Sequence, residues 1–545
     1  ISITSFIKCK YIKPRPKSKL SKYKLYSYLN IAIIRTKKKK KQKSNANYSN
    51  MGNSCESLTK TLSQTVSKEI VNFEDEDKFL VAISQDDPEN LEHRLSTVRK
   101  YYITLLVSCI AIIITALSSI WTFEGPFYQK KFHFSNEVEI LGITLFIFGL
   151  GLALFMSSIS EYAGRKVTFI FSLSGVFIFI IVTIWSPSLT GVFIARFLSG
   201  VFGSAFLSVA NSVVSDIFAN TEVGIPSIFV SCSPFLGPAL GPLLSAVFQH
   251  EPRWGLFTLL IAVFVCLILI VFTYPETYKP ILLAKKAERL RRETGDDRYY
   301  APIEKQTKEV NFIRATLTNC KRPIGLLLKD PMIFTLCFYT GLCLAIIYMF
   351  FVAFPIIYME EVWSFTTVEC ACCYLSIAVG ILIAAPSSLL TQKRYMRRIK
   401  ENNGVSYPEL RLEALKIGGF LTPIGLMIFA WTLYSHVHWF GSLVGAGVFG
   451  MGVFFIFTSI FAYIIDAYRL YAASGMAANS LIRSYMAGIF PLFTRYMFKR
   501  LGVNWAAFLL AMLCVLMIPI PFIFNKYGAF LRAKSPYAWT DPEDI

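Results

Sequence analysis

Hydrophobic residues along this chain of 545 residues are grouped in twelve long runs, separated by polar segments. A helix needs roughly 20 mainly apolar residues to cross a bilayer, and each run approaches that length. The first six runs cover about 101–121, 138–158, 168–185, 190–214, 223–249 and 254–275, and the second six cover about 331–357, 368–391, 414–433, 437–460, 471–497 and 503–524. The pattern predicts an all-α membrane protein with twelve transmembrane helices in two six-helix bundles.

The polar segments divide the chain into six predicted regions. They are a basic low-complexity segment at 1–50, an N-terminal tail at 51–97, a first bundle at 98–275, a central loop at 276–330, a second bundle at 331–528 and a tail at 529–545. Two bundles of six spans around a long loop are the plan of secondary transporters, in which the substrate path lies between the halves.

The composition supports a membrane protein, because 54% of the residues are hydrophobic and only 17% are charged, fewer than in most soluble proteins. Cytoplasmic loops retain lysine and arginine. The segments after the second, eighth and twelfth runs are basic, and they contain Arg165, Lys166, Lys393, Arg394, Arg397, Arg398, Lys400, Lys526, Arg532 and Lys534. We therefore expect both termini and the central loop on the cytoplasmic side, in the plasma membrane, with a helix in the basic stretch from Lys285 to Arg298.

Most of the formal net charge of +20 comes from residues 1–50, which hold fifteen lysines and arginines and no acid. This segment has no methionine before Met51, and its lysine and asparagine bias is that of translated A-rich DNA. One interpretation is that residues 1–50 are not native. The alternatives are a basic arm that binds anionic lipid headgroups and a nucleic-acid tail; for the membrane protein itself no nucleic-acid partner is expected.

Charges inside a membrane are costly, so each one is a functional hypothesis. Arg196 lies about seven residues into the fourth run, where it either snorkels toward the interface or faces a cavity and holds a carboxylate or shifts its pKa. Arg483 lies near the middle of the eleventh run, and a structural ion pair and a role in transport both remain open. The acidic candidates are Glu124 just past the first run, Glu369 at the start of the eighth, and Asp216 and Asp466 at helix ends.

The short segment between the second and third runs reads Ser-Glu-Tyr-Ala-Gly-Arg-Lys from Ser160 to Lys166. Gly164 permits a tight turn, while Glu161, Arg165 and Lys166 provide charges for alternative ion pairs with nearby helix ends. By itself, this segment is better explained as an ordinary basic turn on the cytoplasmic side.

The fifth run contains Gly237, Pro238, Gly241 and Pro242. The two glycines are four residues apart and share one helix face, and each proline removes a backbone hydrogen bond. Such a helix bends and permits close helix contact, and a simple packing kink is the alternative. In the seventh run, Tyr348, Phe350, Phe351 and Phe354 are candidates for an aromatic wall beside the substrate.

The sequence shows no sign of enzyme or cofactor chemistry. Most of the twelve cysteines lie in apolar runs, where a thiol packs as a small hydrophobe. Cys370, Cys372 and Cys373 include a Cys-x-x-Cys spacing, but no second ligand pair accompanies them as a zinc site requires. A Gly-x-x-x-x-Gly-Lys-Ser/Thr phosphate loop does not occur either, which argues against an ATP-driven pump of that type. We expect a non-enzyme without cofactor or metal.

Several of these segments, in order along the chain, carry a resemblance to a known family. They are Glu161–Lys166, the stretch around Arg196, Gly237–Pro242, Pro275–Leu283, Pro423–Leu426, Asp466–Tyr468, Tyr471–Ser474 and Phe490–Thr494. From about Asp87 to Gly528 the chain resembles the fungal branch of the twelve-span drug:proton antiporters in the major facilitator superfamily, the branch that contains polyamine and multidrug exporters.

The resemblance implies roles for individual residues. Glu161, Gly164, Arg165 and Lys166 match the loop thought to control the switch between inward and outward states, Arg196 matches an arginine linked to proton coupling, and Gly237–Pro242 match the antiporter motif. Some positions differ from the family pattern: Glu161 replaces aspartate, Tyr162 replaces a cation, Ser245 and Ala246 replace two glycines, and Glu222-Val223-Gly224 lacks an arginine.

The function that the resemblance implies is proton-coupled export of small hydrophobic or cationic compounds by alternating access. A monomer that contacts substrate, protons and the lipid bilayer is expected. Glu124 is the candidate proton carrier, because spans one and four usually face the same cavity in this fold. The alternative is a membrane nutrient sensor that keeps the same fold without transporting.

Overall fold

The computed structural model describes residues 79–81, 91–218, 222–248, 251, 253–304, 312–401 and 407–538. The chain forms two compact units, Ile1–Phe79 and Leu80–Ile545, and the described helices all lie in the second. Residues 1–50, for which the sequence suggested a non-native origin or a basic arm, lie outside the described residues, so that interpretation stays a prediction.

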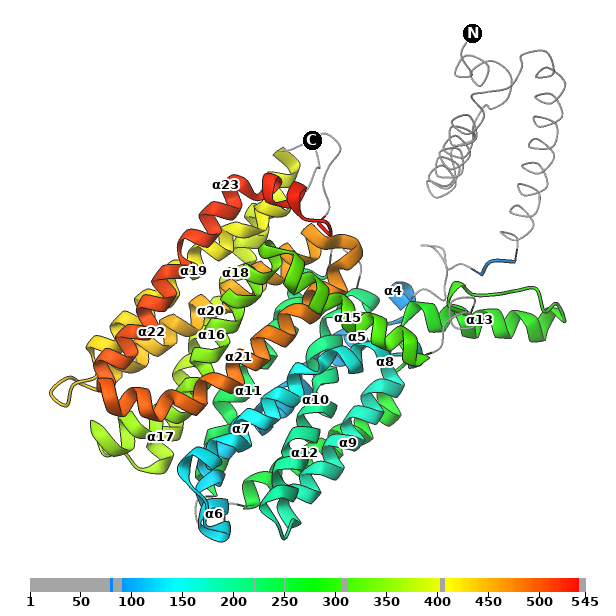
Figure 1. Cartoon of the computed structure of the whole chain (residues 1–545). Helices are drawn as coiled ribbons and strands as arrows, with labels where there is room; N and C mark the ends of the chain where they lie inside the picture. The colour runs from blue at the N-terminus through cyan, green and yellow to red at the C-terminus, as the bar shows by residue number, and fades with distance from the viewer. Residues whose placement is uncertain are drawn as a thin grey trace, which may run out of the picture. The chain divides into compact units, whose positions relative to one another are not determined.

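The first half consists of membrane helices that lie side by side (Figure 1). After the short α4 (Leu91–Arg94) come α5 (Thr97–Ser119), α6 (Trp121–Phe132), α7 (Asn136–Gly151), α8 (Ala153–Ala163), α9 (Arg165–Trp185), α10 (Leu189–Ile217), α11 (Gly224–Val247) and α12 (Arg253–Thr273). Helices α7 and α8 together form one span, which breaks at Leu152. These spans agree with the first six predicted runs to within a few residues.

The second half repeats this plan. Helix α16 (Pro331–Phe354) continues into a π-helix at Pro355–Glu361, and α17 (Thr367–Cys373) and α18 (Leu375–Glu401) form one span. A 3-10 turn at Pro408–Arg411 leads into α19 (Leu412–Trp431), which is followed by α20 (Phe440–Tyr468), α21 (Ala472–Leu501), α22 (Val503–Met517) and α23 (Pro519–Lys534).

Within the described residues, eleven spans are long and apolar enough to cross a membrane. The remaining predicted run is the 30-residue α21, which contains polar residues such as Asn479, Arg483 and Arg495. Because α21 packs against α16 and α7, these residues sit beside protein as well as lipid. In contrast, α12 exposes Ile261, Phe264 and Phe272, as expected of a helix that faces hydrocarbon. The predicted all-α architecture of two six-helix halves is confirmed.

The central loop contains two helices. Helix α13 (Lys279–Thr294) covers most of the basic stretch in which the sequence predicted a helix, and α15 (Phe312–Lys329) was not predicted. Helix α15 packs against α8 of the first half and α21 of the second. The loop therefore contributes a helix that contacts both bundles.

The two halves meet mainly toward one end of the bundle. We call the end with α13 the basic end, and the end with α6 and α17 the opposite end (Figure 1). The turn between α8 and α9 lies at the basic end. Thr144 donates to the carbonyl of Gly488 at 2.9 Å, Tyr496 and Glu137 are hydrogen-bonded at 2.9 Å, and helix α21 packs more extensively on α7 than on α8. The halves are therefore closed against each other toward the opposite end.

Candidate functional site

The turn at the basic end of the first half requires a glycine at position 164. Gly164 has a φ of +91°, a region that side-chain-bearing residues rarely adopt. A Cβ atom at this position would also lie 2.4 Å from Oε2 of Glu276. The positive φ and the contact with Glu276 therefore both disfavour a side chain at position 164. Glu276 itself belongs to the central loop.

Glu276 fixes the start of α9 through backbone amides. Its Oε1 accepts from the amides of Arg165 at 3.0 Å, Thr277 at 2.9 Å and Tyr278 at 2.8 Å, and its Oε2 accepts from the amide of Lys166 at 3.2 Å. A carboxylate is stabilised at a helix N-terminus, where unpaired N–H groups and the helix dipole favour negative charge. Glu276 lay within the segment that carried the resemblance, and its position three residues after the end of α12 was the sequence signal for this role.

Arg165 is buried beside this carboxylate and joins three elements. Its guanidinium donates to Oγ of Ser160 at 2.7 Å and pairs with Asp216 at 3.3 Å, and it lies 4.6 Å from the ring centroid of Tyr278. Glu161 is within electrostatic reach of Arg165, without a direct ion pair in the described part of the chain. Burial raises the pKa of Tyr278, so its hydroxyl stays protonated at neutral pH.

The second half contains a matching pair. Arg411 forms an ion pair with Asp466 at 2.9 Å and lies 3.7 Å from the ring centroid of Tyr395. In each half an arginine at the start of the third span therefore pairs with an aspartate near the end of the fourth. The two aspartates that the sequence placed at helix ends occupy corresponding positions, as expected for structural repeats.

We expect Glu276→Gln to reduce export several-fold without loss of membrane expression. The amide side chain keeps the size of the glutamate but lacks its negative charge. The interaction of that charge with the N-terminus of α9 contributes about 1 kcal/mol. The measurement is the initial rate of efflux, normalised to the amount of protein in the membrane.

The matched control is Glu288→Gln on the exposed face of α13, where Glu288 pairs with Arg292 of the same helix. This control should transport at the parental rate. Equal rates for Glu276→Gln and Glu288→Gln would show that the contact with α9 is dispensable.

Arg196 lies inside the first half and does not snorkel. Its side chain is 1% exposed and donates to the carbonyls of Gly142 at 3.1 Å, Leu117 at 2.7 Å and Ser118 at 3.2 Å. Two of these carbonyls belong to the last turn of α5, where helix carbonyls lack partners and the dipole favours a cation. Arg196 therefore holds the end of α5 against α7.

The aromatic rings of Trp121 and Phe146 enclose the same guanidinium. Their centroids lie 5.1 Å and 4.9 Å from it, in the range of cation–π contacts. Trp121 is fixed in turn, because its indole N–H donates to the carbonyl of Glu139 at 2.8 Å. The orientation of Arg196 thus depends on α5, α6 and α7 together.

Glu124 is a fully buried carboxylate near Arg196. It lies in α6, and neither carboxylate oxygen has a hydrogen-bond partner among the described residues. A Cβ at Gly255 would lie 2.5 Å from its Oε1, so the side chain fits against the start of α12. Arg196 and Glu124 interact electrostatically, but the described residues form no direct ion pair between them. A buried anion without donors is unfavourable, so this site favours a neutral carboxyl.

A second acid, Glu139, was missed by the sequence reasoning. It lies in the first turn of α7, and a Cβ at Gly125 would be 2.6 Å from its Oε1. Glu139 of α7 therefore lies against Gly125, the residue that follows Glu124 in α6. The sequence signal for Glu139 was its position near the start of the second hydrophobic run. Acidic residues at the start of a span commonly lie at the membrane–water interface, so this signal was not used.

Contacts continue from Arg196 into the second half. Ser118, whose carbonyl accepts from Arg196, has its hydroxyl 3.0 Å from the hydroxyl of Tyr348 in α16. Tyr348 in turn lies in the electrostatic neighbourhood of Arg483, without a hydrogen bond between them among the described residues. We call Glu124, Arg196, Ser118, Tyr348 and Arg483 the interface chain, since it crosses from one six-helix half to the other.

Arg483 is surrounded by aromatic rings and has no carboxylate partner in the described part of the chain. Its guanidinium lies 5.7 Å from the ring centroid of Phe457 and 5.6 Å from that of Phe461, and its Nε has no hydrogen-bond acceptor there. The sequence left two interpretations of Arg483 open, a structural ion pair and a role in transport. The described residues contain no ion pair of Arg483, so the first interpretation has no support among them.

The aromatic wall suggested for the seventh span is mostly core. Phe350 and Phe354 pack against Phe429 of the same half, at centroid distances of 5.3 Å and 5.9 Å. Tyr348 differs from them, because its hydroxyl contacts the first half through Ser118. Aromatic residues in a span more often pack in the protein core than face a substrate. Phe350 and Phe354 follow this rule, because they pack inside the second half.

The glycines of the fifth span lie against α5. A Cβ at Gly237 would be 2.0 Å from Oγ1 of Thr115, and one at Gly241 would be 2.1 Å from Oγ of Ser119. Three prolines, Pro234, Pro238 and Pro242, lie within α11. The helix therefore packs backbone to backbone with α5, next to the carbonyls that Arg196 holds.

The cysteines at the start of the eighth span are part of a packed helix. Cys370 and Cys373 are buried in α17, and the thiol of Cys373 donates to the carbonyl of Glu369 at 3.3 Å. Glu369 itself completes a capping box with Thr366. The described residues contain no group of three side chains suited to hold a metal ion.

Two six-helix halves with repeated arginine–aspartate pairs, and a chain of buried polar residues that crosses their interface, define a secondary transporter. The family model of the Major Facilitator Superfamily matches residues 106–491. The chain belongs to this superfamily, whose members are transporters and not enzymes.

Curated relatives come from fungi. A probable drug/proton antiporter of Saccharomyces cerevisiae, YHK8, is 52% identical, and the match covers 84% of this chain and 89% of that protein. The efflux pump atB of Aspergillus terreus is 39% identical over 71% of this chain and 83% of its own length. The multidrug transporter FLU1 of Candida albicans is 33% identical over 85% of this chain and 77% of its own length. The resemblance to fungal drug:proton antiporters is confirmed.

A solved structure shares the fold. The partially occluded inward-open conformation of the xylose transporter XylE from E. coli gives a TM-score of 0.56, covering 79% of this chain and 98% of that one. The sequences are only 11% identical, so this likeness concerns the fold alone.

Proposed function

We propose that this protein exports small hydrophobic or weakly cationic compounds in exchange for protons, by alternating access. The observation that carries the proposal is the interface chain, which connects the buried carboxyl of Glu124 to side chains of the other half. The relatives named as a drug/proton antiporter, an efflux pump and a multidrug transporter support it. The nutrient-sensor alternative has no support of this kind.

Glu124 is the proposed proton carrier and Arg196 the residue that senses its charge. When Glu124 is neutral, its burial without donors costs little, and when it is ionised, the electrostatic attraction to Arg196 increases. Arg196 also binds the Ser118 carbonyl, so a shift of its guanidinium displaces the end of α5. That end carries the hydroxyl contact to Tyr348 of the second half.

Substrate selection is assigned to the surroundings of Arg483. A cation at this depth disfavours multiply charged polyamines, which need carboxylates along their path. Of the two rings beside Arg483, that of Phe461 is partly exposed and offers surface for apolar compounds, whereas that of Phe457 is buried. Both contacts limit the hydration of Arg483. Hydrophobic drugs are therefore expected to be exported in preference to spermidine.

We place the protein in the plasma membrane as a monomer with its basic end in the cytoplasm. The lysines and arginines of the loops at that end support the orientation. With the halves closed toward the opposite end, this conformation then faces the cytoplasm.

The test is accumulation of a labelled hydrophobic drug in inside-out vesicles with an imposed pH gradient, acidic inside. Accumulation that disappears when the gradient is collapsed supports exchange for protons. A sensor would bind its ligand without any gradient-dependent accumulation, and preferential accumulation of spermidine would contradict the substrate assignment.

We expect Tyr348→Phe to shift the conformational equilibrium away from the state closed at the opposite end. The change removes one hydroxyl contact between the halves, worth about 1 kcal/mol, or roughly a fivefold change in the ratio of states. The measurement is the distance between spin labels attached at the exposed Ser135 and Ser435, one in each half at that end.

Tyr374→Phe is the matched control, since the Tyr374 hydroxyl donates to the carbonyls of Phe350 and Phe351 within its own half. It should leave the distance distribution unchanged. An unchanged distribution in Tyr348→Phe as well would remove this hydrogen bond from the mechanism.

A further inference from the structure

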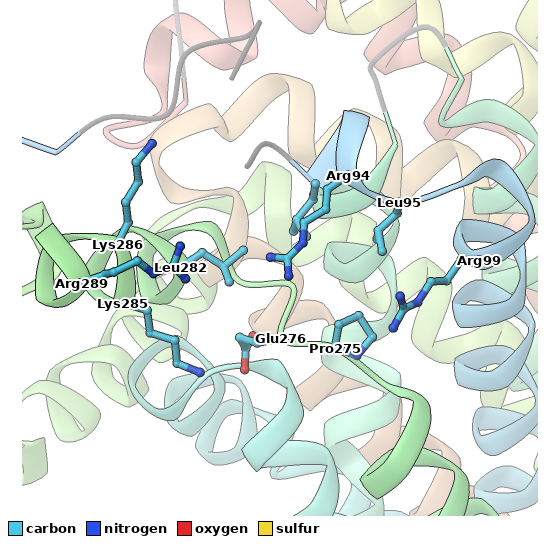
Figure 2. A pocket seen from close by; sticks show the side chains of 10 residues that line it. Arg94, Leu95, Arg99, Pro275, Glu276, Leu282, Lys285, Lys286 and Arg289 are labelled. Atoms are coloured by element: carbon cyan, nitrogen blue, oxygen red, sulfur yellow. The ribbon is translucent and has the colours of Figure 1, made fainter. Parts of the chain in front are cut away.

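A cavity of about 330 Å³ lies at the basic end, between the start of the first half and helix α13 (Figure 2). Its lining includes five cations: Arg94, Arg99, Lys285, Lys286 and Arg289. Arg94 and Arg99 come from α4 and the first turn of α5, and the other three come from α13. Two segments far apart in sequence thus bring positive side chains to one cavity.

The one carboxylate in this lining is already engaged. Both oxygens of Glu276 accept from backbone amides at the start of α9 and in the adjoining loop. Arg94, Arg99 and Lys285 have no ion-pair partner among the residues that the structure describes. Like charges gathered around one cavity repel one another, so the cavity is suited to an anion with more than one negative charge.

The cavity lies at the membrane boundary. Arg99 belongs to the first turn of the first span, and Pro275 follows the end of α12 by two residues. The hydroxyls of Tyr102 and Thr273, 3.0 Å apart, connect these two span ends. Leu91, Leu95 and Leu282 add apolar surface to the lining, which suits a ligand that is charged at one end and apolar at the other.

We propose that this cavity binds the phosphorylated headgroup of an anionic membrane lipid, of the phosphoinositide class. Arginine and lysine are the residues that bind phosphate oxygens through charge-assisted hydrogen bonds, and basic pockets beside membrane helices bind such headgroups. The position at two span ends and the leucines favour a lipid over a soluble phosphate. The proposal rests on the fold and does not depend on the proposed export function.

The α13 side of the cavity is held by contacts within the central loop and with Val81. Arg291 pairs with Glu304 at 2.7 Å, and the amide of Val81 donates to the carbonyl of Tyr300 at 3.1 Å. Val81 also packs with Ala287 and Ala301 in a small apolar cluster. A bound headgroup would therefore bridge an ordered central-loop helix and the first span, and it would stabilise the folded protein by mass action.

The test measures binding of a fluorescent short-chain phosphatidylinositol bisphosphate to the purified full chain in phosphatidylcholine nanodiscs. Each basic side chain near an anionic headgroup contributes about fivefold in affinity, so Arg94→Gln with Lys285→Gln should weaken binding by about 25-fold. The charge-retaining pair Arg94→Lys with Lys285→Arg should bind nearly as the parent does, which separates charge from folding.

The matched control removes two charges elsewhere on the membrane protein. Lys393→Gln with Lys400→Gln changes a second basic surface, along α18, and should leave affinity within about threefold of the parent. Equal weakening in both double variants would overturn the proposal in favour of non-specific attraction. Equally tight binding of soluble inositol trisphosphate would overturn the lipid assignment, because the apolar part of the ligand would then contribute nothing.

Discussion

Glu124→Gln is expected to abolish pH-driven drug accumulation in vesicles while leaving the protein folded and in the membrane. Glutamine fits the buried space against α12, but it cannot take up and release a proton. Drug binding should remain measurable, because Glu124 belongs to α6 of the first half, whereas the rings around Arg483 belong to α20 of the second. The matched control is Glu251→Gln, an exposed acid at the same end, which should accumulate drug as the parent does.

Arg196→Ala should have the same effect for a different reason. The variant leaves the carbonyls of Leu117, Ser118 and Gly142 without their donor, each a loss of about 1–3 kcal/mol if no water replaces it. Arg196→Lys keeps the charge but not the planar fork that reaches three carbonyls, so it should restore accumulation only in part. If Arg196→Ala vesicles keep the parental dependence on the gradient, Arg196 has a structural role only.

Gly241→Leu is expected to abolish export at normal membrane expression. A Cβ at this position would lie 2.1 Å from Oγ of Ser119 and 2.4 Å from the carbonyl oxygen of Ala116, so α11 must separate from α5. Small residues permit such close helix approach in membranes, and the separation would displace the helix end that Arg196 holds. The measurement is drug efflux from whole cells at matched protein levels.

Gly224→Leu is the control on the same helix, because a Cβ there would meet nothing within 4 Å. It should export normally. Gly241→Ala, which introduces only the clashing Cβ, should export less than the parent and more than Gly241→Leu, and monodisperse elution of each variant would show that the loss is not misfolding. Normal efflux by Gly241→Leu would exclude a role for this close contact.

The spans, their grouping into two halves and the positions of Gly164, Arg196 and Gly241 could be read from the chain alone. Hydrophobic length is a local property, because every backbone polar group of a lipid-exposed segment must be satisfied within its own helix. The family motifs are also short and continuous. Sequence reasoning therefore located the elements and named most of the charged residues that the structure brings inside.

The contacts of those residues were decided only by the tertiary structure. Glu276 caps a helix that begins 111 residues earlier, and Ser118 meets Tyr348 across 230 residues. Arg196 was expected either to snorkel or to face a cavity and act on a carboxylate. It is buried, its hydrogen bonds go to three carbonyls, and Glu124 interacts with it electrostatically. Such partners depend on which helix faces pack together. In a membrane the lipid and the protein interior are equally apolar, so the hydrophobicity of a helix does not show which of its faces contacts protein. The sequence determined where the helices are, and the packing of the two halves determined which polar groups meet.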